Sequence, residues 1–207
     1  MTITIIGTGN MARGIGTRLV AAGRAPLLYG TSEAKTAALA DALGAEVAAD
    51  LDAALASDIV VLATPYDASL ALAEAHAPRL AGKIVVDISN PMNANFDGLA
   101  TAPGTSAAEQ IAAAAPRARI VKAFNTTFAG TLVDGEVSGQ RLDVLIAGDD
   151  SDAKATVAGL VEGGGLVPID VGPLRRARQL EGMALLGITL QFSLGTEFAT
   201  AWKLVRP

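Results

Sequence analysis

The sequence predicts an α/β fold, a doubly wound and mostly parallel sheet with helices on both faces. Two observations lead to this prediction. Short runs rich in β-branched residues alternate with Ala-rich stretches of helical length, and hydrophobic residues make up 51% of the 207-residue chain. Apolar strands that alternate with helices are typical of a parallel sheet buried on both faces. At this length we expect one domain, residues 1–172, followed by a short helical appendage, residues 173–207.

Eight segments have the character of strands, because each is a short apolar run bounded by turn residues or by an Ala-rich stretch. They are residues 2–6, 26–29, 45–48, 58–63, 83–87, 119–124, 142–147 and 166–170. Six helices are expected between them, at residues 11–22, 32–43, 51–56, 68–80, 106–115 and 152–162. Ser32 is placed to cap the second helix and Gly44 to end it, and Asp150 or Ser151 is placed to cap the sixth.

The appendage reads as a long helical stretch interrupted by Gly182, Gly187 and Gly195. Its apolar residues recur at steps of three and four, which is typical of a helix with one apolar stripe. The stripe includes Leu180, Met183, Leu190, Leu194, Phe198 and Trp202. We expect this stripe to pack on the domain or on a second copy of the chain, and the sequence therefore favours a homodimer.

Charge and composition exclude several classes of function. The 16 basic and 21 acidic residues give a net charge of -5 without a long basic run, so nucleic acid is not an expected partner. The absence of Cys excludes thiolate chemistry, and the single histidine, His76, reads as a surface or helix-end residue without companions for a metal site. No basic leader precedes the first apolar run, and the uncharged segment 182–196 is shorter than the roughly 20 residues of a membrane span. We expect a cytoplasmic protein without a membrane anchor.

A glycine motif follows the first strand directly and opens the first helix. It reads Gly7-Thr8-Gly9-Asn10-Met11-Ala12. In this position the first glycine permits a tight turn, the second lets the backbone approach a pyrophosphate, and the small third residue permits close packing of helix on strand. The context at both ends of the motif predicts a Rossmann-type dinucleotide-binding domain.

The end of the second strand favours NADP over NAD. An NAD site normally presents a carboxylate there, about 20 residues after the glycines, to hold the ribose hydroxyls. This chain instead has Tyr29-Gly30-Thr31-Ser32, followed by Lys35. Two hydroxyls, a helix N-terminus and a cation suit the additional phosphate of NADP, although Thr31 and Ser32 also suit a helix cap and Lys35 a solvated surface position.

Polar residues also follow three later strands, at the sheet edge where ligands of open α/β folds bind. The three segments are Thr64-Pro65-Tyr66, Ser89-Asn90-Pro91 and Phe124-Asn125-Thr126-Thr127. Each is compatible with an ordinary turn, but their convergence favours a nicotinamide site. Asn125 and Thr126 are the candidates to hold a carboxamide or a ring carbonyl, and Tyr66 is a candidate wall of the site.

Four segments in order carry a resemblance to a known family. They are GTGNMARGIG near the start, VKAFNTTFAGTL in the middle, AGDD at 147–150 and DVGPLRRARQLE at 170–181. Together they resemble the NADPH-dependent reductases of the deazaflavin coenzyme F420, and also the NADPH domains of the six-transmembrane metalloreductases. The resemblance implies that the pyrophosphate lies over residues 8–11 and the additional phosphate near Thr31 and Ser32. It also implies that the nicotinamide lies near Thr64, Pro65 and residues 123–125, that is Ala123, Phe124 and Asn125.

The sequence therefore predicts an NADP(H)-dependent oxidoreductase that passes a hydride between nicotinamide and a small redox substrate, F420 or a flavin. Such a transfer between two rings needs positioning more than acid–base groups, and the chain has no obvious catalytic dyad. Relative to the family, this chain has Asn125 where the deazaflavin reductases often carry His, and it lacks an Arg beside the adenosine phosphate. Two alternatives remain open, a reductase of small carbonyls or imines and a non-catalytic NADP(H)-binding module.

Overall fold

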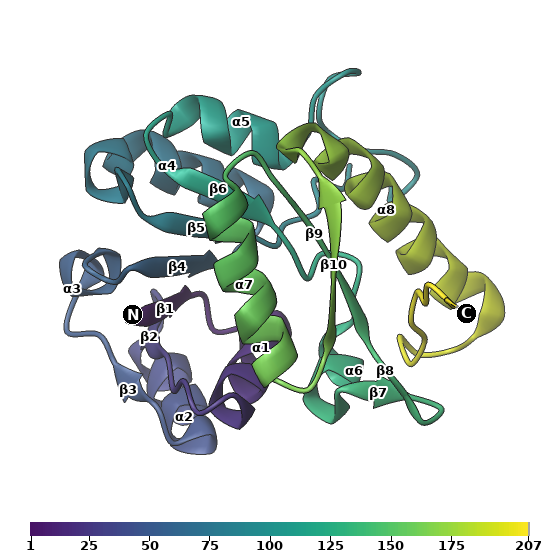
Figure 1. Cartoon of the computed structure of the whole chain (residues 1–207), viewed down its shortest axis with the longest axis horizontal. Helices are drawn as coiled ribbons and strands as arrows, with labels where there is room; N and C mark the ends of the chain where they lie inside the picture. Colours follow the sequence, from purple (N-terminus) through teal and green to yellow (C-terminus); the bar gives the residue numbers. More distant parts are fainter. Residues whose placement is uncertain (207) are drawn as a thin grey trace.

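The computed structural model describes residues 1–206, which form one large sheet covered by helices (Figure 1). All eight predicted strand segments are present in this sheet. They are β1 (Ile3–Ile6), β2 (Leu27–Tyr29), β3 (Glu46–Val47), β4 (Ile59–Leu62), β5 (Ile84–Asp87), β6 (Arg119–Lys122), β9 (Asp143–Gly148) and β10 (Val167–Gly172). A two-stranded hairpin that the sequence did not predict, β7 (Glu136–Val137) with β8 (Gln140–Arg141), lies outside it.

The strand order is β10-β9-β6-β5-β4-β1-β2-β3, and the sheet is parallel except where β9 pairs with β6. The order reverses between β1 and β4, because the chain moves outward through β2 and β3 and returns to β4 beside β1. Ligands of open α/β sheets bind outside the carboxyl ends of the strands at such a reversal. The predicted doubly wound, mostly parallel α/β fold is thus confirmed.

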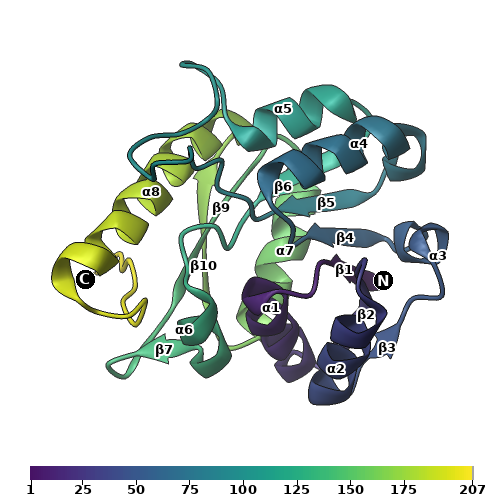
Figure 2. The same ribbon diagram turned by 180° about the vertical axis from the view of Figure 1, so that it is seen from behind.

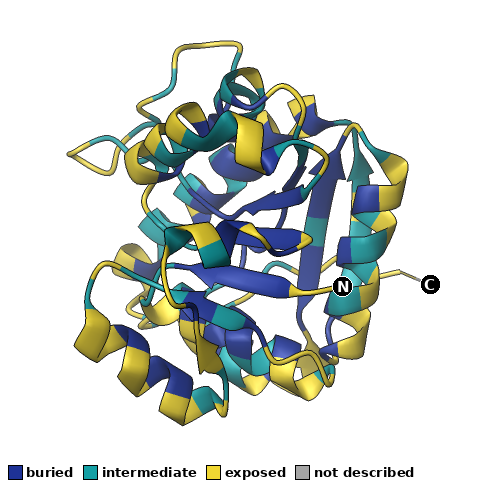
Figure 3. Ribbon diagram, turned by 90° about the vertical axis from the view of Figure 1, so that its left-hand side faces the viewer, coloured by how far each residue is buried: buried dark blue, intermediate teal, exposed yellow. Residues whose placement is uncertain are grey.

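Helices cover both faces of the sheet. They are α1 (Asn10–Ala21), α2 (Glu33–Leu43), α3 (Leu51–Leu55), α4 (Tyr66–Leu80), α5 (Ala107–Ala114), α6 (Ala129–Asp134), α7 (Ser151–Gly163) and α8 (Ala177–Leu194), with a 3-10 turn at Leu174–Arg176. Figure 2 shows α4 and α5 on one side of the sheet and α1 and α2 on the opposite side. Each face has its own buried apolar cluster, one packed under α1, α2 and α7 and the other under α4 and α5. The central strands β1, β4 and β5 are buried throughout, whereas β3 and β10 at the two edges of the sheet are not (Figure 3).

Local signals in the sequence explain several helix boundaries. The Ser32 hydroxyl accepts a hydrogen bond from the Lys35 amide at the start of α2, and Gly44 ends that helix in the left-handed conformation. The Asp150 carboxylate likewise accepts from the Ala153 amide at the start of α7. Both caps were predicted, and a carboxylate at a helix N-terminus also opposes the positive end of the helix dipole.

The appendage differs from its prediction. Helix α8 is continuous through Gly182 and Gly187 and ends at Gly195, which adopts the left-handed conformation. A glycine inside a helix costs only about 1 kcal/mol, which backbone hydrogen bonds and packing offset. At Gly187 the missing side chain has a packing role, since a Cβ there would lie 3.0 Å from the Trp202 Nε1 atom. The predicted helical stripe was therefore wrong at its end, because Phe198 and Trp202 lie in the returning segment beyond the helix.

The segment after α8 folds back onto the protein. The Gln191 side chain in α8 donates to the Thr200 hydroxyl and accepts from the Thr196 hydroxyl. Further along, the Lys203 ammonium pairs with the buried Asp143 carboxylate of β9, which also accepts from the backbone amide of Leu204. These contacts hold the C-terminal segment against α8 and the far side of the sheet (Figure 1).

Candidate functional site

The turn between β1 and α1 has the geometry that its glycines predict. Gly7 has a φ of 122°, and a Cβ at that position would lie 2.2 Å from the carbonyl oxygen of Ala63 at the end of β4. The Gly7 amide donates to the carbonyl of Tyr29 at the end of β2. Only glycine fits this conformation and this space, and the turn is thereby fixed between the strands at the point where the strand order reverses.

The start of α1 is open to solvent. Gly9 is the N-cap residue and offers no side-chain cap, so the first amides of the helix are not occupied by the residue that precedes them. No atom lies within 4 Å of a Cβ built on Gly9, and both Gly9 and Asn10 are exposed. Free amides at the positive end of a helix dipole form an anion site, and no side chain of the described residues blocks this one.

The end of β2 lies against the glycine turn. A Cβ on Gly30 would lie 2.6 Å from Thr8 Cγ2 and 2.9 Å from the Thr36 hydroxyl, so a larger residue there would push the two loops apart. Thr31 and Lys35 are exposed, whereas the Ser32 hydroxyl is engaged in capping α2. The structure thus leaves a hydroxyl, a cation and the start of a second helix available beside the turn.

The ends of β5 and β6 are joined by a pair of side-chain amides. The Asn90 amide group donates to the backbone carbonyl of Asn125 at 2.9 Å, and the Asn125 amide group donates to Asn90 Oδ1, also at 2.9 Å. Asn125 is 4% exposed, and its Oδ1 atom has no hydrogen-bond partner among the described residues. A buried carbonyl oxygen without a donor is costly, and this one is therefore a candidate acceptor for a ligand N–H group.

The backbone is strained immediately before Asn125. Phe124 is buried and adopts a φ of 63°, which a bulky side chain rarely does. The turn is held by Thr127, whose amide and hydroxyl both donate to the Phe124 carbonyl, the hydroxyl at 2.7 Å. Strain of this kind is concentrated at functional sites, and here it directs Asn125 toward Asn90.

A buried charged cluster lies beneath the amide pair, and the sequence did not reveal it. Asp87 ends β5, Lys122 ends β6, and the two are paired in register. The Lys122 ammonium lies 2.7 Å from Asp87 Oδ2 and 2.9 Å from Glu181 Oε1 of helix α8, and it also donates to the Ser89 carbonyl. All three charged side chains are 0% exposed. We call Asp87, Lys122 and Glu181 the buried triad.

Glu181 also binds the start of α5. Its carboxylate accepts hydrogen bonds from the amides of Ala107 and Ala108, at 3.1 and 3.4 Å. Desolvation raises the pKa of Glu181 above its ordinary value, while the Lys122 ammonium opposes that rise. Every donor of the ammonium is used within the cluster, which is the condition for a buried cation to be tolerated.

A cavity of about 550 Å³ opens beside these elements. It lies between the start of α1, the exits of β5 and β6, the start of α6, and the second half of α8 with the segment that follows it. Four predicted site residues line it, namely Asn10, Met11, Asn90 and Asn125. The remaining wall is largely apolar and aromatic, and it consists of Phe96, Thr127, Phe128, Ala129, Gly130, Ile188, Phe192, Glu197 and Phe198.

The aromatic part of this wall is held together by edge-to-face contacts. The Phe198 ring lies 5.3 Å from the Phe128 ring and 5.8 Å from the Phe192 ring, nearly perpendicular to both. Phe192 and Phe198 belong to the predicted appendage, residues 173–207, for which no functional role was expected. Their part in the cavity depends on the fold-back of the C-terminal segment, for which the sequence carries no local signal.

Other predicted residues lie outside the lining of this cavity. The Thr64 hydroxyl is bonded to the Ser69 hydroxyl at 2.7 Å, and the Tyr66 hydroxyl donates to the side chain of Gln110 on α5. Burial raises the pKa of the Tyr66 hydroxyl above its ordinary value, with Asp67 adding to the effect. Thr126 is buried beside Thr127, which lines the cavity in its place.

Pro91 and Ala123 are also buried, one directly after Asn90 and the other directly before Phe124. His76 lies at a kink inside α4, two residues before Pro78, and the described residues contain no cluster suited to a metal ion. Within the same residues no helix has the length and apolar character to cross a bilayer.

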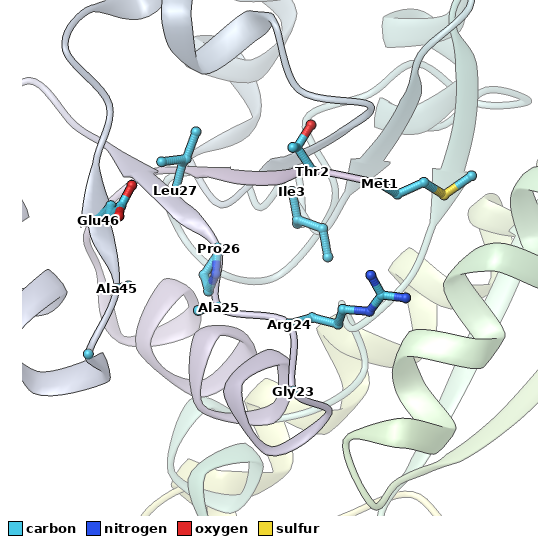
Figure 4. A pocket seen from close by; sticks show the side chains of 11 residues that line it. Met1, Thr2, Ile3, Gly23, Arg24, Ala25, Pro26, Leu27, Ala45 and Glu46 are labelled. Atoms are coloured by element: carbon cyan, nitrogen blue, oxygen red, sulfur yellow. The ribbon is translucent and has the colours of Figure 1, made fainter.

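A second hollow of about 530 Å³ lies at the opposite end of the sheet (Figure 4). It is lined by the first residues of β1, β2 and β3, and by Arg24, which extends toward Met1. Ligands of this class of sheet bind at the carboxyl ends of the strands, so this amino-terminal hollow is a poor candidate for the functional site.

Three features meet at one edge of the sheet: an open helix N-terminus after a glycine turn, a second strand that ends without a carboxylate, and an amide pair with one unpartnered oxygen. This arrangement is typical of dinucleotide-binding proteins of the Rossmann type. A model of the family described as NADP oxidoreductase, coenzyme F420-dependent, matches residues 2–91. The F420-dependent NADP reductase of Methanothermobacter thermautotrophicus is 31% identical over 209 residues, covering 92% of this chain and 89% of the relative. The crystal structure of a proposed F420-dependent NADP-reductase from Arthrobacter sp. FB24 superposes with a TM-score of 0.86, at 32% identity over 100% of both chains.

Metalloreductase STEAP3 of Rattus norvegicus is 34% identical over 186 residues. The match covers 88% of this chain but 36% of that relative, so the chain spans about a third of the metalloreductase. The chain belongs to the family of F420-dependent NADP oxidoreductases. This membership confirms the family resemblance drawn from the four sequence segments, and it makes the chain an NADP-dependent oxidoreductase.

Proposed function

We propose that the protein binds NADP(H) along the carboxyl edge of the sheet and transfers a hydride between the nicotinamide and a ring-shaped acceptor in the 550 Å³ cavity. The observation that carries this proposal is the unpartnered, buried Oδ1 atom of Asn125, a residue that lines the same cavity as the start of α1. The first feature suits a carboxamide N–H group and the second a pyrophosphate, and both are parts of one dinucleotide.

The residues present fit this cofactor. The amides of Gly9, Asn10 and Met11 would hold the pyrophosphate over the turn after β1, with Gly7 and Thr8 shaping that turn. Thr31, Ser32 and Lys35 would hold the additional phosphate of NADP, since two of them are exposed and the third begins α2. The amide pair of Asn90 and Asn125 would hold the nicotinamide carboxamide, and when bound the cofactor supplies the hydride.

The protein's part in the transfer is to orient the two rings and to exclude water. Reacting carbons must approach within roughly 3 to 3.5 Å, which favours rigid amides over mobile charged groups at this edge. The rings of Phe128, Phe192 and Phe198 give the cavity an apolar wall against which an acceptor ring can stack. Thr126 is assigned a supporting role, because it is buried in the turn that presents Asn125.

The favoured acceptor is the deazaflavin F420, with a flavin as the other member of the same chemical class. Family membership and the relatives named for F420 support this assignment, and so does the aromatic cavity wall. The metalloreductase relative adds metal complexes, such as a ferric chelate, to the acceptors to be tested.

The direct test is an acceptor panel. Purified protein is mixed with NADPH and with F420, FMN, a quinone or a ferric chelate, and oxidation is followed by the loss of absorbance of the reduced nicotinamide. We expect turnover with F420 or with FMN, and faster turnover with NADPH than with NADH. Turnover of small ketones or imines alone would favour the carbonyl or imine reductase alternative. Binding of NADPH without turnover of any acceptor would favour the non-catalytic module.

Asn125→Ala tests the residue on which the proposal depends. We expect turnover to fall by about tenfold to a hundredfold, while the affinity for NADPH falls by less than about threefold, because the pyrophosphate and adenosine contacts remain. Stopped-flow oxidation gives the first quantity and fluorescence titration gives the second. Equal losses in both would contradict an orienting role for this amide.

We also propose a cytoplasmic homodimer. Leu186 and Leu194 of α8 are 51% and 64% exposed and lie on the same side of the helix, so α8 presents apolar side chains that the rest of the chain does not cover. Sedimentation velocity at several concentrations tests the dimer, and a species of 20.9 kDa at all of them would contradict it.

A further inference from the structure

The buried triad lies directly beneath the amide pair to which the proposed function assigns the nicotinamide. Asp87 and Lys122 are the last residues of two neighbouring parallel strands, and they are partners in the register of the sheet. Asn90 and Asn125 each follow three residues after these strand ends, in the segments that leave β5 and β6. The ion pair and the amide pair are therefore two successive cross-links between the same strand ends.

Ser89 connects the two cross-links. Its amide donates to Asp87 Oδ1 at 2.9 Å, and its carbonyl accepts from the Lys122 ammonium. Both polar groups of this backbone unit are thus held by buried charges, and hydrogen bonds to charged groups are stronger and more directional than neutral ones. The next residue is Asn90, so the direction in which its amide group leaves the sheet is set by the triad.

Glu181 extends the same cross-link to the other walls of the cavity. It lies on α8, whose Ile188 and Phe192 line the cavity two and three turns further along. Through the amides of Ala107 and Ala108 it also fixes the start of α5. One carboxylate therefore joins the helix of the acceptor wall to the strands that carry the proposed nicotinamide site.

We infer that Asp87, Lys122 and Glu181 act as positioning residues, which set the distance and angle between the nicotinamide site at Asn90 and Asn125 and the acceptor wall on α8. This inference rests on the proposed function. None of the three is among the cavity-lining residues, and all three are 0% exposed, so they act through Ser89 and the two helices without touching a ligand. A buried ion cluster is weak support for stability but a precise device for register, which is the role assigned to it.

A neighbouring ion pair provides a matched control. Arg178 of α8 forms a two-pronged pair with Glu109 of α5, at 2.8 and 2.6 Å. It joins the same two helices as Glu181 does, but it is partly exposed and has no bond to either strand end. Loss of this pair loosens the contact between α8 and α5 and leaves the triad intact.

The test compares Glu181→Gln with Arg178→Gln. Fluorescence titration measures the affinity for NADPH. The emission intensity and lifetime of bound NADPH report how firmly the reduced ring is held. Turnover is measured with the acceptor that the acceptor panel identifies. For Glu181→Gln we expect affinity to stay within about threefold, the emission of bound NADPH to fall toward that of the free cofactor, and turnover to fall by about tenfold or more. Arg178→Gln should match the unmodified protein in all three measurements.

The outcomes separate the inference from the proposed function. Unchanged emission and turnover in Glu181→Gln, or equal changes in both variants, would overturn the positioning role and leave the proposed function standing. Failure of the unmodified protein to bind NADPH would overturn both. If Glu181→Gln does not fold, Glu181→Asp keeps the charge with a shorter reach, and hydrogen exchange of the amides of residues 88–90 reports the same loosening without any acceptor. Unchanged emission and exchange in a folded Glu181→Asp would equally refute the inference.

Discussion

Gly7→Ala tests the turn on which cofactor binding depends. Two independent costs are visible in the structure. The φ of 122° lies in a region that residues with a Cβ rarely adopt, which costs about 1–3 kcal/mol. The new Cβ would also lie 2.2 Å from the Ala63 carbonyl oxygen, where ordinary contact begins at 3.4 Å, so the turn must move by more than 1 Å.

Relaxation of this clash is restricted. The backbone amide of Ala63 donates a hydrogen bond to the carbonyl of Ile6, and the backbone amide of Gly7 donates one to the carbonyl of Tyr29, both at 2.8 Å. A displacement of about 1 Å at a positioning element costs roughly a hundredfold in function, or about 2.7 kcal/mol. We therefore expect the dissociation constant for NADPH to rise by about two orders of magnitude. The melting temperature of the free protein should also fall, by about 2–4 °C for each kcal/mol lost.

Two glycine-to-alanine controls isolate the cause. Gly9→Ala meets no atom within 4 Å, so the free protein should keep its melting temperature while the pyrophosphate loses its close approach to the backbone. Gly159→Ala lies in α7 with open space around the new Cβ, so neither the melting temperature nor the affinity for NADPH should fall. Fluorescence titration and calorimetry measure the two quantities. A Gly7→Ala protein with unchanged melting temperature and NADPH affinity would refute the reasoning.

Three further perturbations test other parts of the structure. Lys35→Glu should weaken NADPH binding by about tenfold and leave NADH nearly unaffected, since only NADPH carries the phosphate assigned to that cation; parallel titrations check this. Lys122→Met should lower the free energy of unfolding by about 3–5 kcal/mol in urea titrations, because two buried carboxylates lose their cation; a loss below about 1 kcal/mol would contradict the ionised state of the cluster. Arg178→Gln should cost less than about 1 kcal/mol at pH 7, because the pair is partly exposed. The hydrogen bonds from Arg178 lower the pKa of Glu109 below its ordinary 4.5. The contribution of the pair to the free energy of unfolding is therefore present above pH 4.5 and is lost as the pH falls through the lowered pKa. Urea titrations between pH 7 and pH 3 should show the stabilities of Arg178→Gln and the unmodified protein converging.

The glycine turn and the strand exits were predictable because their signals are local. A glycine motif between a strand and a helix has one physical interpretation, and polar residues after parallel strands must meet at one edge of the sheet. Four of the cavity-lining residues were found in this way, namely Asn10, Met11, Asn90 and Asn125.

The buried triad was not found because its members are far apart in the chain. Lys122 is 35 residues from Asp87 and 59 residues from Glu181, and no periodic pattern connects them. A partial signal was nevertheless present, since the strands IVVD and RIVK both end in a charged residue that directly follows apolar residues. Two opposite charges at the buried ends of neighbouring strands indicate an ion pair, and the sequence-based prediction did not include it.

The aromatic wall and the small hairpin were missed for a different reason. The place of Phe198 depends on the fold-back after Gly195, and the hairpin of β7 and β8 on a tight turn at Ser138 and Gly139, where both residues have positive φ. Continuity of α8 through Gly182 and Gly187 likewise reflects packing that propensity alone does not encode. For the aromatic wall and for α8, a contact between distant segments decides the local conformation.

The position of Glu181 so late in the chain has a consequence for how the protein is made. The ribosome synthesises β5, β6 and α5 before α8. Until α8 is present, the Lys122 ammonium has one carboxylate partner instead of two, and the Ala107 and Ala108 amides lack the Glu181 carboxylate as their acceptor. The contacts at the carboxyl ends of β5 and β6 are therefore complete only after α8 has been synthesised. Truncation of the chain before Glu181 would remove the second carboxylate beside Lys122 and the acceptor of the Ala107 and Ala108 amides.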